Sequence, residues 1–197
     1  MLIIEHRINT ISGLKKVPSE HGVEIDVRYD NRTGSLYLNH DLGEGEDLEA
    51  YLQNFHHAFI TFNIKEAGIE NRCIALAAKY GISKSKYFLL DVEFFYLFCA
   101  SRQDGVREIA VRYSEAEPIE MALSQKGFVD WAWIDVCTRL PLDAAAVQAL
   151  KGFKTCLVSP DRWGRPQDIP VYIEQMKKLN FKLDAVMVGG EHAHLWA

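Results

Sequence analysis

Two acidic residues stand two positions apart in an apolar stretch of the chain, GVEIDVR at residues 22–28. Side chains two apart on an extended strand share a face, so Glu24 and Asp26 point the same way. Ionised carboxylates side by side in an interior repel each other and are costly to desolvate, so they need a cation. The pattern predicts either a hard divalent ion, Mg²⁺ or Ca²⁺, or a structural ion network. The candidate partners in such a network are Arg7, Arg28 and Lys65.

Two histidines stand at positions that can serve the same site. His6 ends the first apolar run of the chain, and His40 follows the short extended run 35–39. Imidazole titrates near neutral pH, so two histidines beside a metal site are suited to general acid and base catalysis. His56 and His57 are interpreted as the end of a helix. His192 and His194 are interpreted as a mobile tail, and metal binding by this tail is the lesser alternative.

These positions depend on the strands that carry them. Strands that are apolar on both faces and alternate with amphipathic helices form a parallel sheet, and eight such units can close into a barrel. We therefore predict an α/β fold, a (β/α)8 TIM barrel. An open doubly wound sheet is the alternative, but no GxGxxG follows the first strand. The eight predicted strands are residues 2–7, 23–28, 58–65, 87–92, 108–112, 131–136, 155–159 and 185–189.

Capping and stop residues mark the helices between these strands. Glycine or asparagine at the end and aspartate or proline at the start predict helices near residues 68–80, 118–127, 143–152 and 168–180. The predicted barrel is small and somewhat truncated, since residues 13–19 are a short connection between the first two strands. Only eight residues follow Gly189, so the last helix is missing or replaced. With 197 residues and no linker, the chain is predicted to be a single domain, residues 1–197.

Polar residues gather where the predicted strands end, which is where a barrel of this type has its active site. They are His6, Arg7, Glu24, Asp26, Arg28, Asn63, Lys65, Asp91, Glu93, Arg112, Asp135 and Ser159. The loop SPDRWGRP, residues 159–166, offers Arg162, Trp163 and Arg165 either to a polar ligand or to ordinary loop packing.

The quoted residues carry a resemblance to a known family. EHRIN at residues 5–9, GVEIDVR at residues 22–28 and LYLNHD at residues 36–41 resemble the HR, ExDV and HD motifs of the glycerophosphodiester phosphodiesterases. FNIK at residues 62–65 falls where that family has an ExK motif. The family belongs with the barrels that resemble phosphatidylinositol-specific phospholipase C.

The resemblance implies a metal-dependent phosphoric diester hydrolase. His6 and His40 would be the acid–base pair, and Arg7 and Lys65 would hold phosphate oxygens. The ligands of the divalent cofactor would be Glu24, Asp26 and Asn63. A divalent ion and fixed cations stabilise the charge that develops on the non-bridging oxygens of a phosphodiester.

The chain departs from the family pattern at three points. Ile8 stands where HRG has glycine, Asn63 replaces the third acidic ligand, and only residues 42–57 separate the HD motif from the third strand. The family insertion that covers the glycerol-binding side is therefore absent. Asp91 or Glu93 are candidates to replace the missing acid.

Three functions remain open at this point. The first is hydrolysis of a glycerophosphodiester or a related polyol-phosphate diester. The second is a phospholipase C-like lyase reaction, in which a substrate hydroxyl attacks phosphorus and leaves a cyclic phosphate. The third is a non-catalytic barrel that binds a phosphorylated ligand. In each case the expected partner is a small molecule.

Composition excludes several other classes. A net charge of −5 removes the basic surface that nucleic-acid binding needs. No apolar run reaches the roughly 18 residues of a membrane span, and the first five residues are too short for a signal peptide, so a cytoplasmic protein is predicted. Four scattered cysteines without CxxC spacing are predicted to be buried free thiols. No feature indicates an oligomeric state.

Overall fold

All eight predicted strands are present in the computed structural model, which describes residues 1–197. They are β1 Leu2–Glu5, β2 Gly22–Tyr29, β5 Phe59–Ile64, β6 Tyr87–Leu90, β7 Ala110–Tyr113, β8 Trp131–Ile134, β9 Lys154–Val158 and β10 Ala185–Val188. Several of these strands stop one or two residues before the predicted end. The polar residues at their ends therefore lie in the first positions of the loops. Two short strands were not among the eight, β3 Leu36–Leu38 and β4 Glu46–Asp47.

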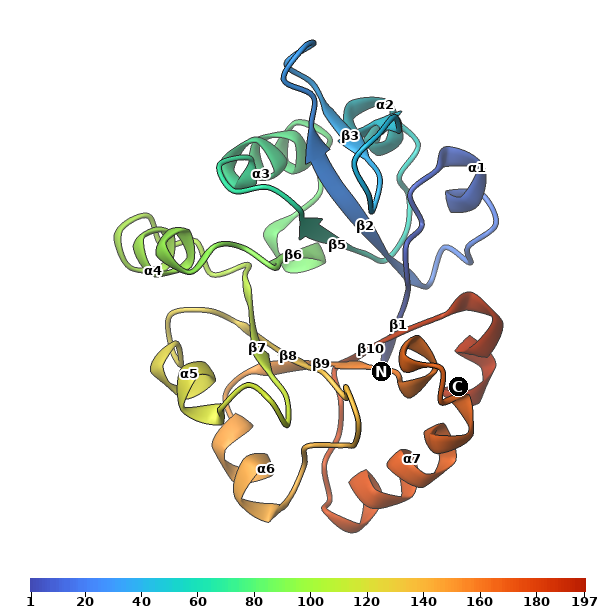
Figure 1. The fold of residues 1–197 in the computed structure, drawn as a ribbon, viewed down its shortest axis with the longest axis vertical. Helices are drawn as coiled ribbons and strands as arrows, with labels where there is room; N and C mark the ends of the chain where they lie inside the picture. Colours follow the sequence, from blue (N-terminus) through green and yellow to red (C-terminus); the bar gives the residue numbers. More distant parts are fainter. The chain divides into compact units, whose positions relative to one another are not determined.

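The chain divides into two compact units, each with parallel strands and helices (Figure 1). The N-terminal unit is residues 4–99, and the C-terminal unit is residues 100–197 with residues 1–3. The assignment of residues 1–197 to a single domain stays a prediction.

In the N-terminal unit, β2 is the central strand. Its first residues pair in parallel with β1, its full length pairs in parallel with β5, and β5 pairs with β6. The end of β2 pairs antiparallel with β3, which pairs with β4. Residues 22–27 of β2 are all buried, as expected for a parallel strand covered on both faces. The helical segments are α1 Ile11–Leu14, α2 Leu48–Gln53, α3 Glu70–Lys79, η1 Lys84–Lys86 and α4 Phe94–Gln103, which runs past the end of the unit.

In the C-terminal unit, the strands are parallel in the order β10, β9, β8 and β7. The cap predicted for the helix near residues 143–152 is confirmed. The Asp143 carboxylate accepts the Ala146 N–H at 2.8 Å where α6 begins. The helical segments are α5 Ile119–Ser124, α6 Ala144–Leu150, η2 Pro160–Trp163, η3 Pro166–Asp168, α7 Ile169–Lys178 and η4 Gly190–Leu195.

The structure corrects two histidine assignments. His56 and His57 do not end a helix: α2 stops at Gln53, and the buried His57 ring lies 3.0 Å from the Val17 carbonyl oxygen in the connection to β5. His192 and His194 do not form a tail without structure, because both lie in η4. This 3-10 helix takes the place of the last barrel helix, as the short C-terminal segment predicted. None of the helices has the length and apolar character that crossing a bilayer requires.

Candidate functional site

Except for His40, which follows β3, the residues predicted for the site come from three neighbouring strands of the N-terminal unit. His6 and Arg7 follow β1, Glu24 and Asp26 lie on β2, and Asn63 is near the end of β5. The three strands are parallel, so their carboxyl ends meet at one edge. The β2–β5 register places Asp26 opposite Asn63.

Glu24 is as deeply buried as Asp26, with its side chain 1% exposed. The Arg7 backbone N–H donates to Glu24 Oε2 at 2.8 Å, and the Asn63 amide donates to Oε1 at 2.9 Å. His6 Nε2 lies 3.8 Å from Oε2. Burial, together with the charge of Asp26, raises the pKa of Glu24 to about 7 in spite of these hydrogen bonds.

Asp26 titrates in the opposite direction. Burial alone would raise its pKa, but hydrogen bonds from Lys65 and Asn9 lower it below its ordinary value. Lys65 Nζ lies 2.8 Å from Oδ1, while the Asn9 amide donates to Oδ2 at 2.7 Å and accepts the Asp26 N–H at 2.8 Å. Near neutral pH, Asp26 is therefore ionised while Glu24 is close to half protonated.

The backbone after β1 is shaped to reach Glu24. Arg7 has a φ of 55°, in the left-handed region, and its N–H points to the Glu24 carboxylate. The next N–H, that of Ile8, donates to the Glu24 carbonyl at 2.9 Å. The positive φ is at Arg7 and not at Ile8, so this chain has no need of glycine at the position where the family motif has one. The Arg7 side chain is exposed.

His40 is held at the rim of the group by its own main chain. The Arg28 guanidinium donates to the His40 carbonyl at 2.8 and 3.2 Å and pairs with Glu66 at 3.0 Å. Arg28 therefore fixes the His40 loop and does not pair with the acids. The imidazole is 39% exposed, and its Nδ1 lies 2.9 Å from Asp41 Oδ1. A positive His40 is among the smaller influences that lower the pKa of Asp26, so the imidazole is within electrostatic range of that acid.

The donor set fits a hard divalent ion. Asn63 Oδ1 is buried without a hydrogen-bond partner, although the amide nitrogen of the same side chain binds Glu24. Two carboxylates and one amide oxygen are the ligand types that Mg²⁺ and Ca²⁺ prefer. The ion-network alternative is present in part, because Lys65 pairs with Asp26. The carboxylate of Glu93, one candidate for the missing acid, accepts the Tyr96 N–H at 3.1 Å in the first turn of α4.

Several polar residues at the strand ends and in the loop 159–166 of the C-terminal unit make internal contacts. The Trp163 indole and the Arg112 guanidinium both donate to Asp135 at 2.8 Å. Arg165 pairs with Asp168 and bonds Tyr172 Oη, each at 2.8 Å, and it also binds the Val136 carbonyl. These contacts agree with the packing interpretation of the loop 159–166.

Sequence reasoning assigned no role to Glu66 or Asp41, which orient the loop and ring of His40. In the C-terminal unit it also missed Asp161 and Glu191. Both follow strands by only a few residues, so extending the search at strand ends into the next turn would have found them.

The fold is shared with solved phosphodiesterases, although neither the protein-family models nor the curated proteins gave a match to this sequence. A glycerophosphodiester phosphodiesterase from Agrobacterium tumefaciens matches with a TM-score of 0.66 and 15% identity over 100% of both chains. A putative glycerophosphoryl diester phosphodiesterase from the same organism has a TM-score of 0.68 and 13% identity, over 100% of this chain and 96% of the other.

A third structure extends the likeness to another organism. It is a phosphodiesterase from Oleispira antarctica in complex with the product sn-glycerol-3-phosphate. It has a TM-score of 0.63 and 17% identity over 100% of this chain and 95% of its own. The full-length coverage in all three comparisons confirms the predicted fold class: the chain has the small (β/α)8 barrel fold of the glycerophosphodiester phosphodiesterases.

Proposed function

We propose that the protein is a phosphoric diester hydrolase that cleaves a glycerophosphodiester or a related polyol-phosphate diester. The observation that carries this proposal is the buried pair of Glu24 and Asp26 at the strand ends, beside His6, with the orphaned Asn63 oxygen and the Lys65 ammonium. The fold supports it, because structural neighbours at full coverage are phosphodiesterases and one of them contains sn-glycerol-3-phosphate as product.

His6 and His40 are the proposed acid–base pair. One imidazole takes the proton of the attacking nucleophile, and the other protonates the leaving alkoxide. His40 has a carboxylate partner, Asp41, whose Oδ1 lies 2.9 Å from Nδ1 and orients the ring. His6 Nε2 lies 3.8 Å from the Glu24 carboxylate, at the strand edge where the two acids lie.

Arg7 and Lys65 are the proposed phosphate-binding residues. The exposed Arg7 guanidinium can form paired hydrogen bonds to two phosphate oxygens, and Lys65 brings a positive charge that Asp26 holds in place. Glu24, Asp26 and Asn63 would hold Mg²⁺ or Ca²⁺. When bound, that ion supplies Lewis-acid stabilisation of charge on the non-bridging oxygens.

The test is turnover of a glycerol phosphodiester in the presence of Mg²⁺ or Ca²⁺, followed by phosphorus NMR. The expected product is a phosphate monoester. His6→Ala and His40→Ala should each lower kcat by at least about 100-fold, the usual contribution of a general acid or base. The exposed His56, outside the site, provides a matched control, and His56→Ala should retain full activity. Full activity in both site variants would refute the assigned roles.

A non-catalytic phosphate-binding barrel is the second candidate. It is favoured by Asn63 in place of an acid and by the contacts of Arg7, Asn9 and Lys65, which already bind both carboxylates. This candidate predicts that sn-glycerol 3-phosphate binds in calorimetry while no diester is turned over. A cyclic phosphate that persists in the NMR assay would instead identify the lyase reaction.

A further inference from the structure

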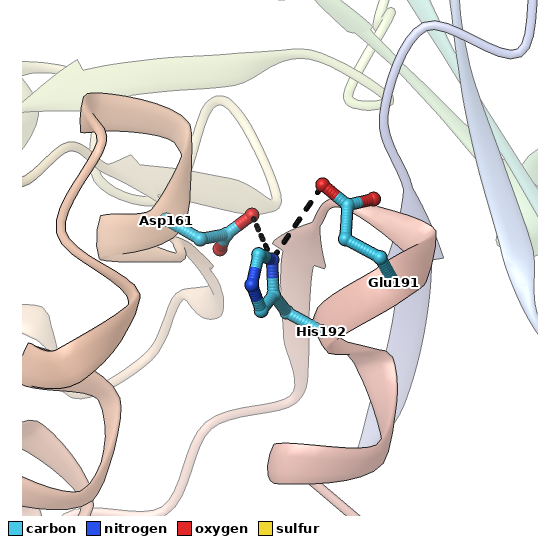
Figure 2. A group of neighbouring side chains, drawn as sticks. All are labelled: Asp161, Glu191 and His192. Atoms are coloured by element: carbon cyan, nitrogen blue, oxygen red, sulfur yellow. Dashed lines mark ion pairs between the residues drawn. The ribbon is translucent and has the colours of Figure 1, made fainter.

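A second group of metal-binding side chains lies in the C-terminal unit. Asp161 is in η2, just after β9, and Glu191 and His192 are in η4, just after β10. Because β9 and β10 are parallel neighbours, these two turns meet at one edge of the sheet. Figure 2 shows the three side chains pointing toward one another, and one ligand atom of each lies within 4.8 Å of the others.

The spacing of the three groups is that of ligands around a small ion. His192 Nδ1 lies 3.5 Å from Asp161 Oδ2 and 3.6 Å from Glu191 Oε1, and this buried nitrogen has no hydrogen-bond partner (Figure 2). Ligands of a tetrahedral zinc ion, with metal–ligand distances near 2.1 Å, are roughly 3.4 Å apart. The imidazole nitrogen is thus shared between two carboxylates at distances too long for good hydrogen bonds.

The Asp161 carboxylate has an incomplete set of hydrogen bonds. The Asp161 side chain is 1% exposed, and its Oδ1 is buried without a hydrogen-bond partner. Its other oxygen accepts the Gly189 N–H at 2.9 Å. The nearest guanidinium nitrogen, Arg162 Nη1, is 3.8 Å from Oδ2, beyond hydrogen-bond distance. A buried carboxylate with an orphaned oxygen calls for a cation.

Gly189 allows the two carboxylates to converge. A Cβ atom at this glycine would lie 2.9 Å from Asp161 Oδ2 and 2.9 Å from both carboxylate oxygens of Glu191. The absence of a side chain at Gly189 therefore brings two negative groups over the same backbone atom, where they repel unless a cation joins them.

We propose that Asp161, Glu191 and His192 bind a divalent transition-metal ion, with Zn²⁺ as the best fit. One imidazole nitrogen with two carboxylate oxygens suits Zn²⁺, whereas Mg²⁺ and Ca²⁺ prefer ligand sets made only of oxygen. Three protein ligands leave a fourth position for water or an exogenous ligand. This site does not depend on the proposed phosphodiesterase function.

The proposal is tested by calorimetric titration with Zn²⁺ and by the visible absorption of bound Co²⁺. Both are measured in the full chain carrying Glu24→Gln and Asp26→Asn, so that the first acidic group cannot contribute. We expect one ion per chain. His192→Ala should weaken Zn²⁺ binding at least about 100-fold, because even the outer partners of metal ligands are worth about 10–100-fold in affinity.

Two further variants make the test specific. Glu191 is 68% exposed, so Glu191→Gln should fold normally, as circular dichroism can verify, and should weaken Zn²⁺ binding by at least about 10-fold. His194→Ala, in the same 3-10 helix but outside the group, should bind Zn²⁺ as the parent does. The proposal is overturned if His192→Ala and Glu191→Gln bind Zn²⁺ with unchanged affinity, or if His194→Ala abolishes binding.

Discussion

Glu24 and Asp26 show how neighbours of the same type acquire different chemistry. Both are buried, but Asp26 has the ammonium of Lys65 and the amide of Asn9, while Glu24 has an amide, a backbone N–H and a like charge nearby. The first set of contacts favours a carboxylate and the second leaves the acid form competitive. Any proton that the pair binds near neutral pH is therefore on Glu24.

The raised pKa of Glu24 has a consequence for stability in the absence of metal. Its folded pKa, about 7, lies above the ordinary 4.5, so the stabilising effect of its proton is complete below pH 4.5 and is lost as the pH rises to about 7. The loss should approach roughly 3 kcal/mol in the free energy of unfolding, at about 1.4 kcal/mol per pKa unit.

Urea unfolding of the chelator-treated protein across this pH range measures that loss. Glu24→Gln cannot ionise, so its stability should not show the same decrease between pH 4.5 and 7. If the wild type and the variant had parallel pH profiles, the titration would belong to another group.

The site was predictable from sequence at the level of residue types, because the period of two on a strand fixes which side chains share a face. The structure brings Glu24, Asp26, Asn63 and Lys65 together as predicted. What the sequence could not reveal is which contacts each acid makes. The Arg7 contribution comes from its backbone N–H, and a main-chain dihedral leaves no trace in the residue type.

At the scale of elements, local rules predicted α6 well. Asp143 caps this helix through the Ala146 N–H, and the capping residue is visible in the sequence. Asp143→Ala should lower the free energy of unfolding by about 1 kcal/mol, the usual value of an N-cap, measured by urea denaturation. Asp143→Ser retains a capping oxygen and should recover most of that loss. Equal loss in both variants would show that Asp143 acts through something other than its cap.

The same local rules failed where tertiary contacts decide the outcome. The position of His57 is set by its buried ring against Val17, a residue 40 positions away, and no helical periodicity reports such a contact. At the C-terminus, η4 forms after the double glycine that ends β10, and its Trp196 cap residue donates to Ser159 at 2.9 Å. The sequence predicted that the last helix is missing or replaced, but not that a short 3-10 helix is anchored there by Trp196.

At the scale of the whole molecule, the alternation of strands and helices was the strongest signal. It predicted all eight parallel strands because buried parallel strands are apolar on both faces. The antiparallel β3 and β4 were harder to predict, since they are two or three residues long and pair only with the end of β2 or with each other. The division into two units cannot be deduced from a chain without linker composition.

Two buried thiols, one in each unit, test whether residues 1–197 unfold as one domain. Burial raises the pKa of Cys73 to about 12 and also raises that of Cys156, so neither forms a reactive thiolate in the folded protein. Cys99 and Cys137 are only half-buried. A thiol reagent at pH 8 should modify these two first.

With increasing urea, Cys73 and Cys156 should become reactive at the same midpoint if the chain unfolds as one domain. The variants Cys73→Ala and Cys156→Ala assign each reaction. Two separate midpoints would show that residues 4–99 and 100–197 open independently.

The left-handed backbone at Arg7 makes the hydrogen bond to Glu24 independent of the side chain at this position. The hydrogen bond to Glu24 comes from the main chain, so it does not require an arginine side chain at this position. Under the proposed phosphate-binding role of Arg7, substitutions there would alter ligand binding without removing that contact from the acid pair. The support of the acidic pair is therefore independent of which side chain stands at this position.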